Sequence, residues 1–406
     1  MSDLHRRSIL RRWRNRPEDG RDVALTAVAS GYFLFVGTQM IFPVLLPYLR
    51  SAYDLTLTAA GLLFTTIWLA NALGTLPGGA ITDRIGGVPV LITSVLLSAG
   101  AITLVVLADS VVLLFGATAI FGVGLAMYGI ARFPVTQDLY PDHLGTVTGV
   151  TLAAADAGQT VLPPIASIVA VVVVWQLGFG FTVPLFLLVA VFLWWSNYIR
   201  VPDSVHSTPA TNSWNVRYLL GELRRPTVVF GTVILCIYGT IWAAFTGFYP
   251  TYLVEVKTLP TTTAAFLFAL FFGTGIFVKP ASGIAYDRLG LRRALLLAAA
   301  IPGFAFAALP FTEGVWTLVI VTVFAAPILG SAAIVQPYVL EVFPEDLRGT
   351  GLASVRTIFL LFTAASPLLF GAVADLGYFD QMYYVLAILA FTNVALVLRI
   401  PVVPVR

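Results

Sequence analysis

Charged residues are scarce in this chain of 406 residues. Asp, Glu, Lys and Arg make up 11% of it and hydrophobic residues 59%, whereas an ordinary soluble domain is about 25% charged. A soluble fold of this length has to cover its surface with polar side chains, and too few are present. The composition therefore excludes a soluble protein and predicts that apolar surface faces lipid. A net charge of +3 gives no general attraction to nucleic acid.

Residues that carry chemistry are also few. Cys236 is the only cysteine, so the chain forms no internal disulfide and no multi-thiolate metal site. The three histidines, His5, His143 and His206, lie in the predicted tail or in polar connections and form no cluster. The sequence also lacks a Gly-x-x-x-x-Gly-Lys-Ser/Thr motif for nucleotide phosphates. We therefore expect no metal, no cofactor, no catalytic residue and no enzyme activity.

The chain has long apolar runs instead. A helix needs about 20 apolar residues to cross roughly 30 Å of hydrocarbon, and Leu25–Leu49 runs for that length without a charged residue. The fold class predicted is an all-α integral membrane protein with twelve transmembrane helices. Their expected spans are 24–49, 56–81, 88–108, 111–136, 146–174, 178–199, 227–251, 262–285, 293–311, 315–339, 350–373 and 380–400.

Two copies of one motif lie 204 residues apart. GGAITDRIGG at 78–87 and SGIAYDRLGL at 282–291 both contain Gly-x-x-x-Asp-Arg-x-Gly, and each follows an apolar run. The same offset carries Tyr48 onto Tyr252. Such doubling is typical of a membrane transporter made of two related halves. The motif residues are Gly79, Asp83, Arg84 and Gly86 in the first copy and Gly283, Asp287, Arg288 and Gly290 in the second.

Basic residues gather on one side of the predicted spans. Seven arginines precede the first span, and 18 of the 23 basic residues fall on the side that holds both chain ends. Because cytoplasmic loops carry an excess of Lys and Arg, we expect both termini in the cytoplasm and the protein in the cytoplasmic membrane. The predicted parts are cytoplasmic tails at 1–23 and 401–406, six-helix bundles at 24–199 and 227–400, and a cytoplasmic linker at 200–226.

A chain of twelve spans with this motif after spans two and eight resembles the major facilitator superfamily. The resemblance runs from the first span to the last, and LYPDHLG at 139–145 is echoed by VFPEDLRG at 342–349. It implies two six-helix bundles related by a pseudo-twofold axis, with the substrate between them near mid-membrane and exposed to each side in turn. The resemblance assigns the motif residues to gating. Their glycines allow close approach, and their Asp and Arg residues lock the cytoplasmic ends together in the outward-open state.

The chain departs from the family pattern at two places. The family usually continues with basic residues after the last glycine of the motif; the second half keeps two arginines at 292–293, but the first has Gly-Val-Pro at 87–89. The cytoplasmic lock is therefore expected to be weaker in the first half. Span five has Gln159, Leu162 and Pro163 where proton-coupled drug antiporters of the family carry Pro, Gly and Gly. This difference argues against drug antiport.

Four charged residues lie well inside predicted spans: Arg132, Asp156, Lys279 and Arg356. A charge at such a position costs about 2.5–3.5 kcal/mol even on a lenient insertion scale. All four are therefore expected to face the bundle interior or the passage between the bundles. Three cations against one acid leave an excess of two positive charges, which suits an anionic solute such as a carboxylate or phosphate.

Asp156 has two interpretations. It carries the coupling proton, since a carboxyl group in apolar surroundings holds a proton more readily, or it stays ionised as the partner of Arg132 on the neighbouring span. Lys279 lies in span eight, which in the family faces span five of the other half. It forms a contact with Asp156 in one state only, or it extends towards cytoplasmic water without a coupling role. We assign a functional role to Arg356 and a structural role to Arg132.

Uncharged polar and aromatic residues complete the candidate site. Tyr238 and Trp242 lie close to one face of span seven, which lines the cavity in the family, so they contact substrate or serve as packing. Gln39, Gln159 and Gln336 lie in apolar helices. Each either hydrogen-bonds to the solute or bridges two helices.

The sequence therefore predicts a secondary active transporter that moves a small organic anion by alternating access. Protons are the expected coupling ion, the lipid bilayer is the surrounding medium, and a monomer without a nucleic-acid partner is expected. The alternative from the same class is efflux of amphipathic drugs by proton antiport, which the aromatic residues of span seven favour. A third interpretation is a non-transporting receptor on the same fold.

Overall fold

The structure is a computed structural model that describes residues 20–198, 221–343 and 348–399. Every regular element in these residues is a helix. The predicted tails and the predicted linker at 200–226 lie mostly outside the described residues.

The helices match the apolar runs of the sequence closely. The first half contains α2 (Arg21–Gln39), α3 (Ile41–Tyr53), α4 (Leu57–Ile85), α5 (Gly87–Val106), α6 (Val111–Leu139), η1 (Pro141–His143), α7 (Leu144–Val172), α8 (Leu177–Gly180) and α9 (Thr182–Tyr198). The second half contains α11 (Pro226–Glu255), α12 (Thr261–Ala308), η2 (Leu309–Phe311), α13 (Val315–Ala325), η3 (Ala326–Gly330), α14 (Ser331–Val342), α15 (Arg348–Asp375) and α16 (Phe379–Arg399).

Eleven helical stretches among the described residues are long and apolar enough to cross a membrane. One of them, Thr261–Phe311, has 51 residues, which is about 76 Å of helix and more than twice the hydrocarbon thickness. Gly290 divides it, because its φ of 77° does not fit a helix. Each of the twelve predicted spans therefore corresponds to a helical segment.

Two predicted spans are interrupted where a continuous helix was expected. Span one changes from α2 to α3 at Met40, because Pro43 has no N–H to donate to the carbonyl oxygen of Gln39. Span ten changes from α13 through the 3₁₀ segment η3 to α14, and Pro327 lies in this segment. Both breaks lie within the spans rather than at their ends.

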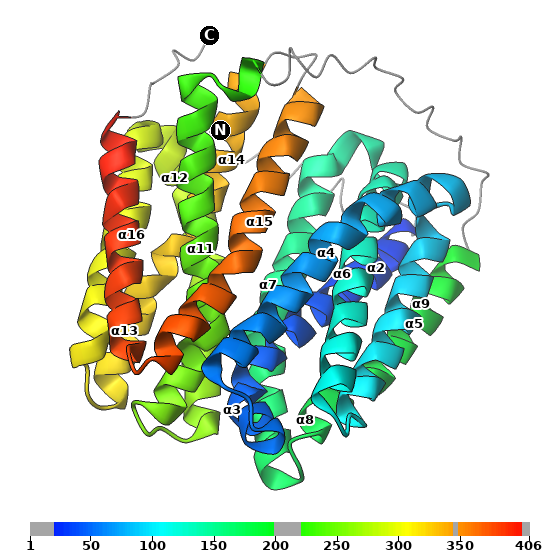
Figure 1. Cartoon of the computed structure of the whole chain (residues 1–406). Helices are drawn as coiled ribbons and strands as arrows, with labels where there is room; N and C mark the ends of the chain where they lie inside the picture. The colour runs from blue at the N-terminus through cyan, green and yellow to red at the C-terminus, as the bar shows by residue number, and fades with distance from the viewer. Residues whose placement is uncertain (1–19, 199–220, 344–347, 400–406) are drawn as a thin grey trace, which may run out of the picture.

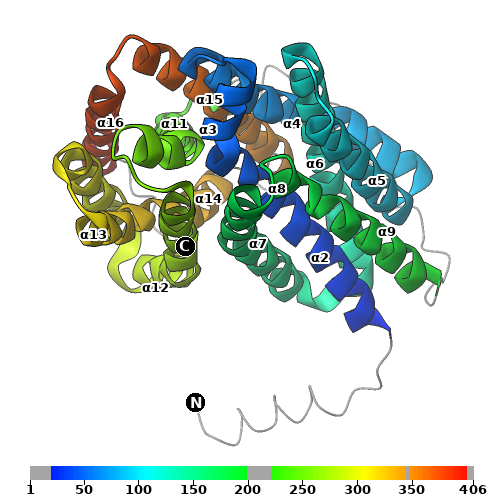
Figure 2. The same ribbon diagram turned by 90° about the horizontal axis from the view of Figure 1, so that it is seen from below.

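The two halves of the chain lie side by side (Figure 1). Seen from the lower end, α2 to α9 form one group and α11 to α16 the other (Figure 2). Across the boundary α4 packs on α15, α7 on α12 and α3 on α11. The expected pairing of span five with span eight is thus confirmed. In Figure 1, α4 and α15 meet near the lower end and diverge towards the upper end.

Packing inside each half relies on close backbone approach and on aromatic side chains. The Tyr128 hydroxyl donates to the carbonyl oxygen of Val28 over 2.6 Å, and a Cβ at Gly31 would lie 2.1 Å from that hydroxyl. In the second half Phe245, Tyr249 and their neighbours form a buried aromatic cluster. Large apolar side chains remain exposed along the helices, as lipid contact requires, among them Leu76, Val112, Phe277, Phe304 and Trp316.

Candidate functional site

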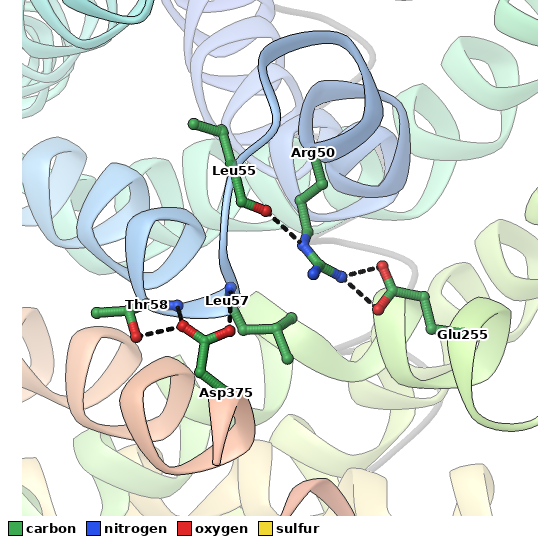
Figure 3. Close-up of polar contacts among 6 residues, drawn as sticks. All are labelled: Arg50, Leu55, Leu57, Thr58, Glu255 and Asp375. Atoms are coloured by element: carbon green, nitrogen blue, oxygen red, sulfur yellow. Dashed lines mark hydrogen bonds and ion pairs between the residues drawn. The ribbon is translucent and has the colours of Figure 1, made fainter. Parts of the chain in front are cut away.

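An ion pair joins the two halves at the lower end in Figure 1, which we call the latch end. Arg50, near the end of α3, donates to both carboxylate oxygens of Glu255, the last residue of α11 (Figure 3). The Arg50 Nε donates to the carbonyl oxygen of Leu55 over 3.1 Å, which orients the guanidinium. Both contacts with Glu255 come from one nitrogen, the Arg50 Nη1, so the pair is a charge-assisted interaction between the halves.

A carboxylate of the second half caps a helix of the first half at the same end. Asp375, the last residue of α15, accepts hydrogen bonds from the backbone N–H of Leu57 over 2.6 Å and of Thr58 over 2.7 Å. It also accepts from the Thr58 hydroxyl (Figure 3). Leu57 and Thr58 begin α4, whose first N–H groups lack helical partners and carry partial positive charge. Asp375 therefore satisfies them from the opposite half.

Glycines allow α4 and α15 to touch next to this cap. A Cβ at Gly61 would lie 2.2 Å from the carbonyl oxygen of Pro367, and a Cβ at Gly371 would lie 2.1 Å from that of Leu57. One helical turn along α4 from Gly61, away from the latch end, the Thr65 hydroxyl donates to the carbonyl oxygen of Ala364 over 2.7 Å. The latch end is thus closed by contacts that involve backbone on both sides.

The opposite end, which we call the motif end, differs. Asp83, Arg84, Asp287 and Arg288 are all exposed, and among the described residues none of them forms an ion pair with the other half. Gly86 and Gly290 both have positive φ, 87° and 77°. They let the chain turn sharply where α4 ends and where α12 divides.

The expected close approach at the other motif glycines is not seen. A Cβ at Gly79 would meet its nearest atom at an ordinary 3.8 Å, and one at Gly283 would meet no described atom within 4 Å. Among the described residues, the motif residues of the two halves do not contact each other in this structure. No backbone segment therefore packs closely against Gly79 or Gly283.

Between the two ends, Lys279 and Asp156 join the halves. The Lys279 Nζ on α12 lies 2.6 Å from the Asp156 Oδ1 on α7, and the Gln159 amide donates to the same oxygen over 3.2 Å. The contact anticipated between Lys279 and Asp156 is therefore confirmed. The Asp156 side chain is 13% exposed and that of Lys279 is 35% exposed, so water reaches the lysine.

Arg132, on α6, is buried and does not pair with Asp156. It donates to the Thr151 hydroxyl over 2.7 Å, and its guanidinium carbon lies 4.0 Å from the centre of the Tyr32 ring. Its Nε has no hydrogen-bond partner among the described residues. The interpretation of Arg132 as the partner of Asp156 is therefore wrong for this structure. The cation is held by a hydroxyl and a ring face, which leaves its charge uncompensated.

Arg356 is the charged residue that the sequence places inside span eleven, and it lies on α15 of the second half. Arg356 and Arg132 lie close enough for their charges to interact, although they belong to opposite halves. Arg356 is exposed and lies about 12 Å along α15 from the first residue of that helix. No carboxylate among the described residues pairs with either arginine.

The remaining candidates surround these charges. Tyr238 is buried, stacks on Phe359 and is near enough to Asp156 for an electrostatic interaction. Trp242 meets Trp68 of the other half edge to face, with ring centres 5.3 Å apart. Gln39 is buried, and its amide nitrogen has no hydrogen-bond partner among the described residues. The backbone of Gln336 lies in α14, and its side chain is not among the described parts.

Sequence reasoning missed the latch residues. No role in the site was predicted for the residues that meet at this end, which are Arg50, Glu255, Asp375, Gly61 and Gly371. One signal was present, because the 204-residue offset places Tyr48 on Tyr252 and Arg50 one position before the equivalent of Glu255. Opposite charges at equivalent ends of two related helices indicate an ion pair near the axis that relates them.

Comparisons with known proteins agree with this architecture. Residues 28–336, well over half of the chain, match the sequence profile described as the Major Facilitator Superfamily. The chain belongs to this superfamily. A hexuronate transporter of Bacillus subtilis (strain 168) is 24% identical over 354 residues, which are 81% of this chain and 82% of that protein. A 2-nitroimidazole transporter of Escherichia coli (strain K12) is 29% identical over 220 residues, 52% of each chain.

Solved structures show the same fold. A bacterial homologue of the human lysosomal transporter Spinster, in an inward-facing and occupied conformation, matches with a TM-score of 0.78 at 15% identity, covering 96% of this chain and 100% of that one. A mutant of the nucleoside transporter NupG matches with a TM-score of 0.79 at 12% identity, over 92% and 99%. This member of the Major Facilitator Superfamily is a multi-pass membrane transporter of small solutes, not an enzyme.

Proposed function

We propose that the protein is a secondary active transporter for a small organic anion, coupled to protons and working by alternating access as a monomer in the cytoplasmic membrane. The observation that carries the proposal is the pair of cations, Arg132 and Arg356, which belong to opposite halves, lie within electrostatic range of each other and form no ion pair with a carboxylate among the described residues. Lys279 already compensates Asp156. The unbalanced charge between the halves is therefore two positive charges.

An anion between Arg132 and Arg356 lowers the free energy of this arrangement. Two cations in a region of low dielectric repel each other, and a carboxylate accepts hydrogen bonds from both guanidinium groups at once. Such an anion also connects the two halves, so its binding is sensitive to how far they are apart. The name of the Bacillus relative supports this class, because a hexuronate is a sugar acid.

Asp156 is the group through which we expect protons to couple. Protonation removes its charge and breaks the ion pair with Lys279, which links α7 to α12. The freed lysine remains cationic beside the passage, so it strengthens attraction for the anion. Proton binding and anion binding therefore favour each other through one lysine, which is the requirement for coupling.

The excess of basic residues on the side of the chain ends supports a cytoplasmic motif end. With that orientation the closed latch faces the exterior, and the exposed motif residues face the cytoplasm. We infer that the structure represents an inward-facing state. In the outward-facing state the latch contacts break, and the motif residues of the two halves lock the cytoplasmic ends.

The anion preference is tested with solutes that share a ring and differ in charge. Glucuronate, glucuronamide and glucosamine carry a negative charge, none and a positive charge, and benzoate, benzamide and benzylamine repeat the series on an apolar ring. Binding to purified protein in lipid nanodiscs is measured by calorimetry. We expect the acid to bind at least tenfold more tightly than its amide, because two cations face it.

Equal affinity for acid and amide in both series, or tighter binding of the amines, contradicts the anion proposal. Uptake into liposomes then separates a transporter from a receptor, since a receptor binds its solute without flux.

Efflux of a neutral aromatic compound is the second candidate. The Trp68 and Trp242 rings face the boundary between the halves, and one relative is named for 2-nitroimidazole, which is a small ring compound. Tighter binding of benzamide than of benzoate is the result that favours this candidate.

A further inference from the structure

Two exposed arginines lie at the motif end of the second half, on helices that pack against each other. Arg293 lies three residues after the turn at Gly290 in α12, and Arg399 is the last residue of α16, which ends at the upper end in Figure 1. α12 packs on α16, and one buried cluster contains the apolar neighbours of both arginines, Ala294 and Val397. The two cations therefore lie on neighbouring helices at one end of the molecule.

Neither arginine is paired with an acid in the described part of the chain. Arg293 and Arg399 are exposed, and the ion pairs found among the described residues include neither of them. Arg225, at the same end, differs because it pairs with Glu222 over 2.6 Å. The charges of Arg293 and Arg399 are thus available to an anion from outside the protein.

Each arginine has a large exposed apolar side chain deeper in the membrane span, on the same helix face. Phe304 follows Arg293 by eleven residues, and Ile388 precedes Arg399 by eleven. Eleven residues make about three helical turns and 16 Å, so both members of each pair share a face. Phe304 is 68% exposed and Ile388 is 63% exposed. A cation at the end of a span with apolar surface along it matches the headgroup and acyl chains of a lipid.

The first half lacks this arrangement. The 204-residue offset places Pro89 at the position of Arg293 and Gly100 at that of Phe304, both in α5. A Cβ at Gly100 would meet no described atom within 4 Å, so the fold leaves room for a larger side chain there. The charge and the exposed ring on α12 are therefore features of the second half that the repeated fold does not require.

We propose that the face formed by α12 and α16 binds one anionic phospholipid, from the leaflet that meets the motif end. The headgroup phosphate accepts hydrogen bonds from Arg293 and Arg399, because guanidinium groups suit phosphate oxygens. The acyl chains lie against Phe304 and Ile388. The site lies within one half and does not include the cations between the halves, so it goes beyond the proposed transport.

Native mass spectrometry of the full chain in a neutral detergent tests this inference, because it measures the binding of single lipids. The probes are phosphatidylglycerol and phosphatidylcholine with identical acyl chains. Arg293→Gln combined with Arg399→Gln removes both charges of the site. The matched control, Arg21→Gln combined with Arg224→Gln, removes two exposed arginines from the same end of the molecule and leaves the α12 and α16 face unaltered.

We expect the unaltered protein to bind phosphatidylglycerol at least tenfold more tightly than phosphatidylcholine. The loss of Arg293 and Arg399 should raise the Kd of phosphatidylglycerol at least tenfold, as two cations beside an anionic headgroup require, and the control should stay within threefold. Without lipid, the melting temperature of the double variant should stay within about 2 °C of the unaltered protein. A larger fall indicates a structural role and overturns the inference.

Three further results would overturn it. Equal binding of both lipids by the unaltered protein shows that the headgroup charge is not recognised. Equal losses in the double variant and its control indicate a general surface charge instead of a site. Displacement of phosphatidylglycerol by the same concentration of glycerol 3-phosphate indicates a site for a soluble anion, because that probe has the phosphate without the acyl chains.

Discussion

Replacing Arg356 with Gln should weaken the binding of glucuronate by roughly 30- to 150-fold, which corresponds to about 2–3 kcal/mol for losing one charged partner in a partly desolvated site. The neutral glucuronamide should lose less than threefold. Arg356 has no carboxylate partner among the described residues, so its removal breaks no ion pair that holds the fold. Repulsion of Arg132 also disappears, and the folded state should be at least as stable as before.

The controls separate charge from shape. Arg356→Lys keeps the charge but not the forked donor geometry, and it should recover part of the affinity. Arg399→Gln removes an exposed arginine at the end of α16 and should have no effect. Equal losses for glucuronate and glucuronamide in Arg356→Gln show that Arg356 is structural, and no loss for glucuronate removes it from the site.

Asp156→Asn should abolish accumulation driven by a proton gradient and spare exchange of solute for solute. In liposomes with a pH difference of one unit, coupling to one proton supports about tenfold accumulation. The variant should equilibrate the solute to a ratio of one, because Asn carries no proton between the two sides. Counterflow of labelled glucuronate against unlabelled glucuronate requires no proton and should continue.

The single substitution leaves Lys279 without its carboxylate, so a loss of activity alone does not identify a proton carrier. Asp156→Asn combined with Lys279→Gln removes both charges and restores neutrality. We expect this double variant to be as stable as the unaltered protein, to keep counterflow and to remain uncoupled. Tenfold accumulation by either variant rules out Asp156 as the coupling group.

The arrangement of spans could be derived from the sequence because each span needs a long apolar run. The family resemblance paired span five with span eight, which made a contact between Lys279 and Asp156 one of two interpretations of the lysine. The break in span one at Met40 could not be derived in the same way. Pro43 was visible, but membrane helices tolerate proline when neighbouring groups satisfy the freed backbone.

The latch illustrates a different limit. Acidic residues such as Glu255 and Asp375 are common at the ends of membrane spans, because they lie near water there and need no partner. Their position in the sequence therefore gives no sign of an interaction. Asp375 reaches the first turn of α4 only when the halves are tilted so that the latch end is closed. The same sequence adopts every tilt of the transport cycle, so it does not indicate which tilt contains this contact. Arg132 is held by the Thr151 hydroxyl and the face of the Tyr32 ring. These contacts likewise depend on side-chain packing, which no sequence motif encodes.

The central claim is that the two halves move about a site between them, so that one end closes as the other opens. Spin labels test it in a Cys236→Ser background, with one pair at Ala52 and Val256 near the latch end and another at Ile85 and Leu289 near the motif end, all exposed positions. Gly61→Val keeps the latch from closing, because a Cβ there would lie 2.2 Å from the Pro367 carbonyl oxygen.

Double electron–electron resonance then measures both distances with and without Gly61→Val. The account predicts that this substitution lengthens the distance between the labels at 52 and 256 and shortens the one between the labels at 85 and 289. A latch end that opens while the motif end keeps its separation would contradict the account, as would two distances that lengthen together.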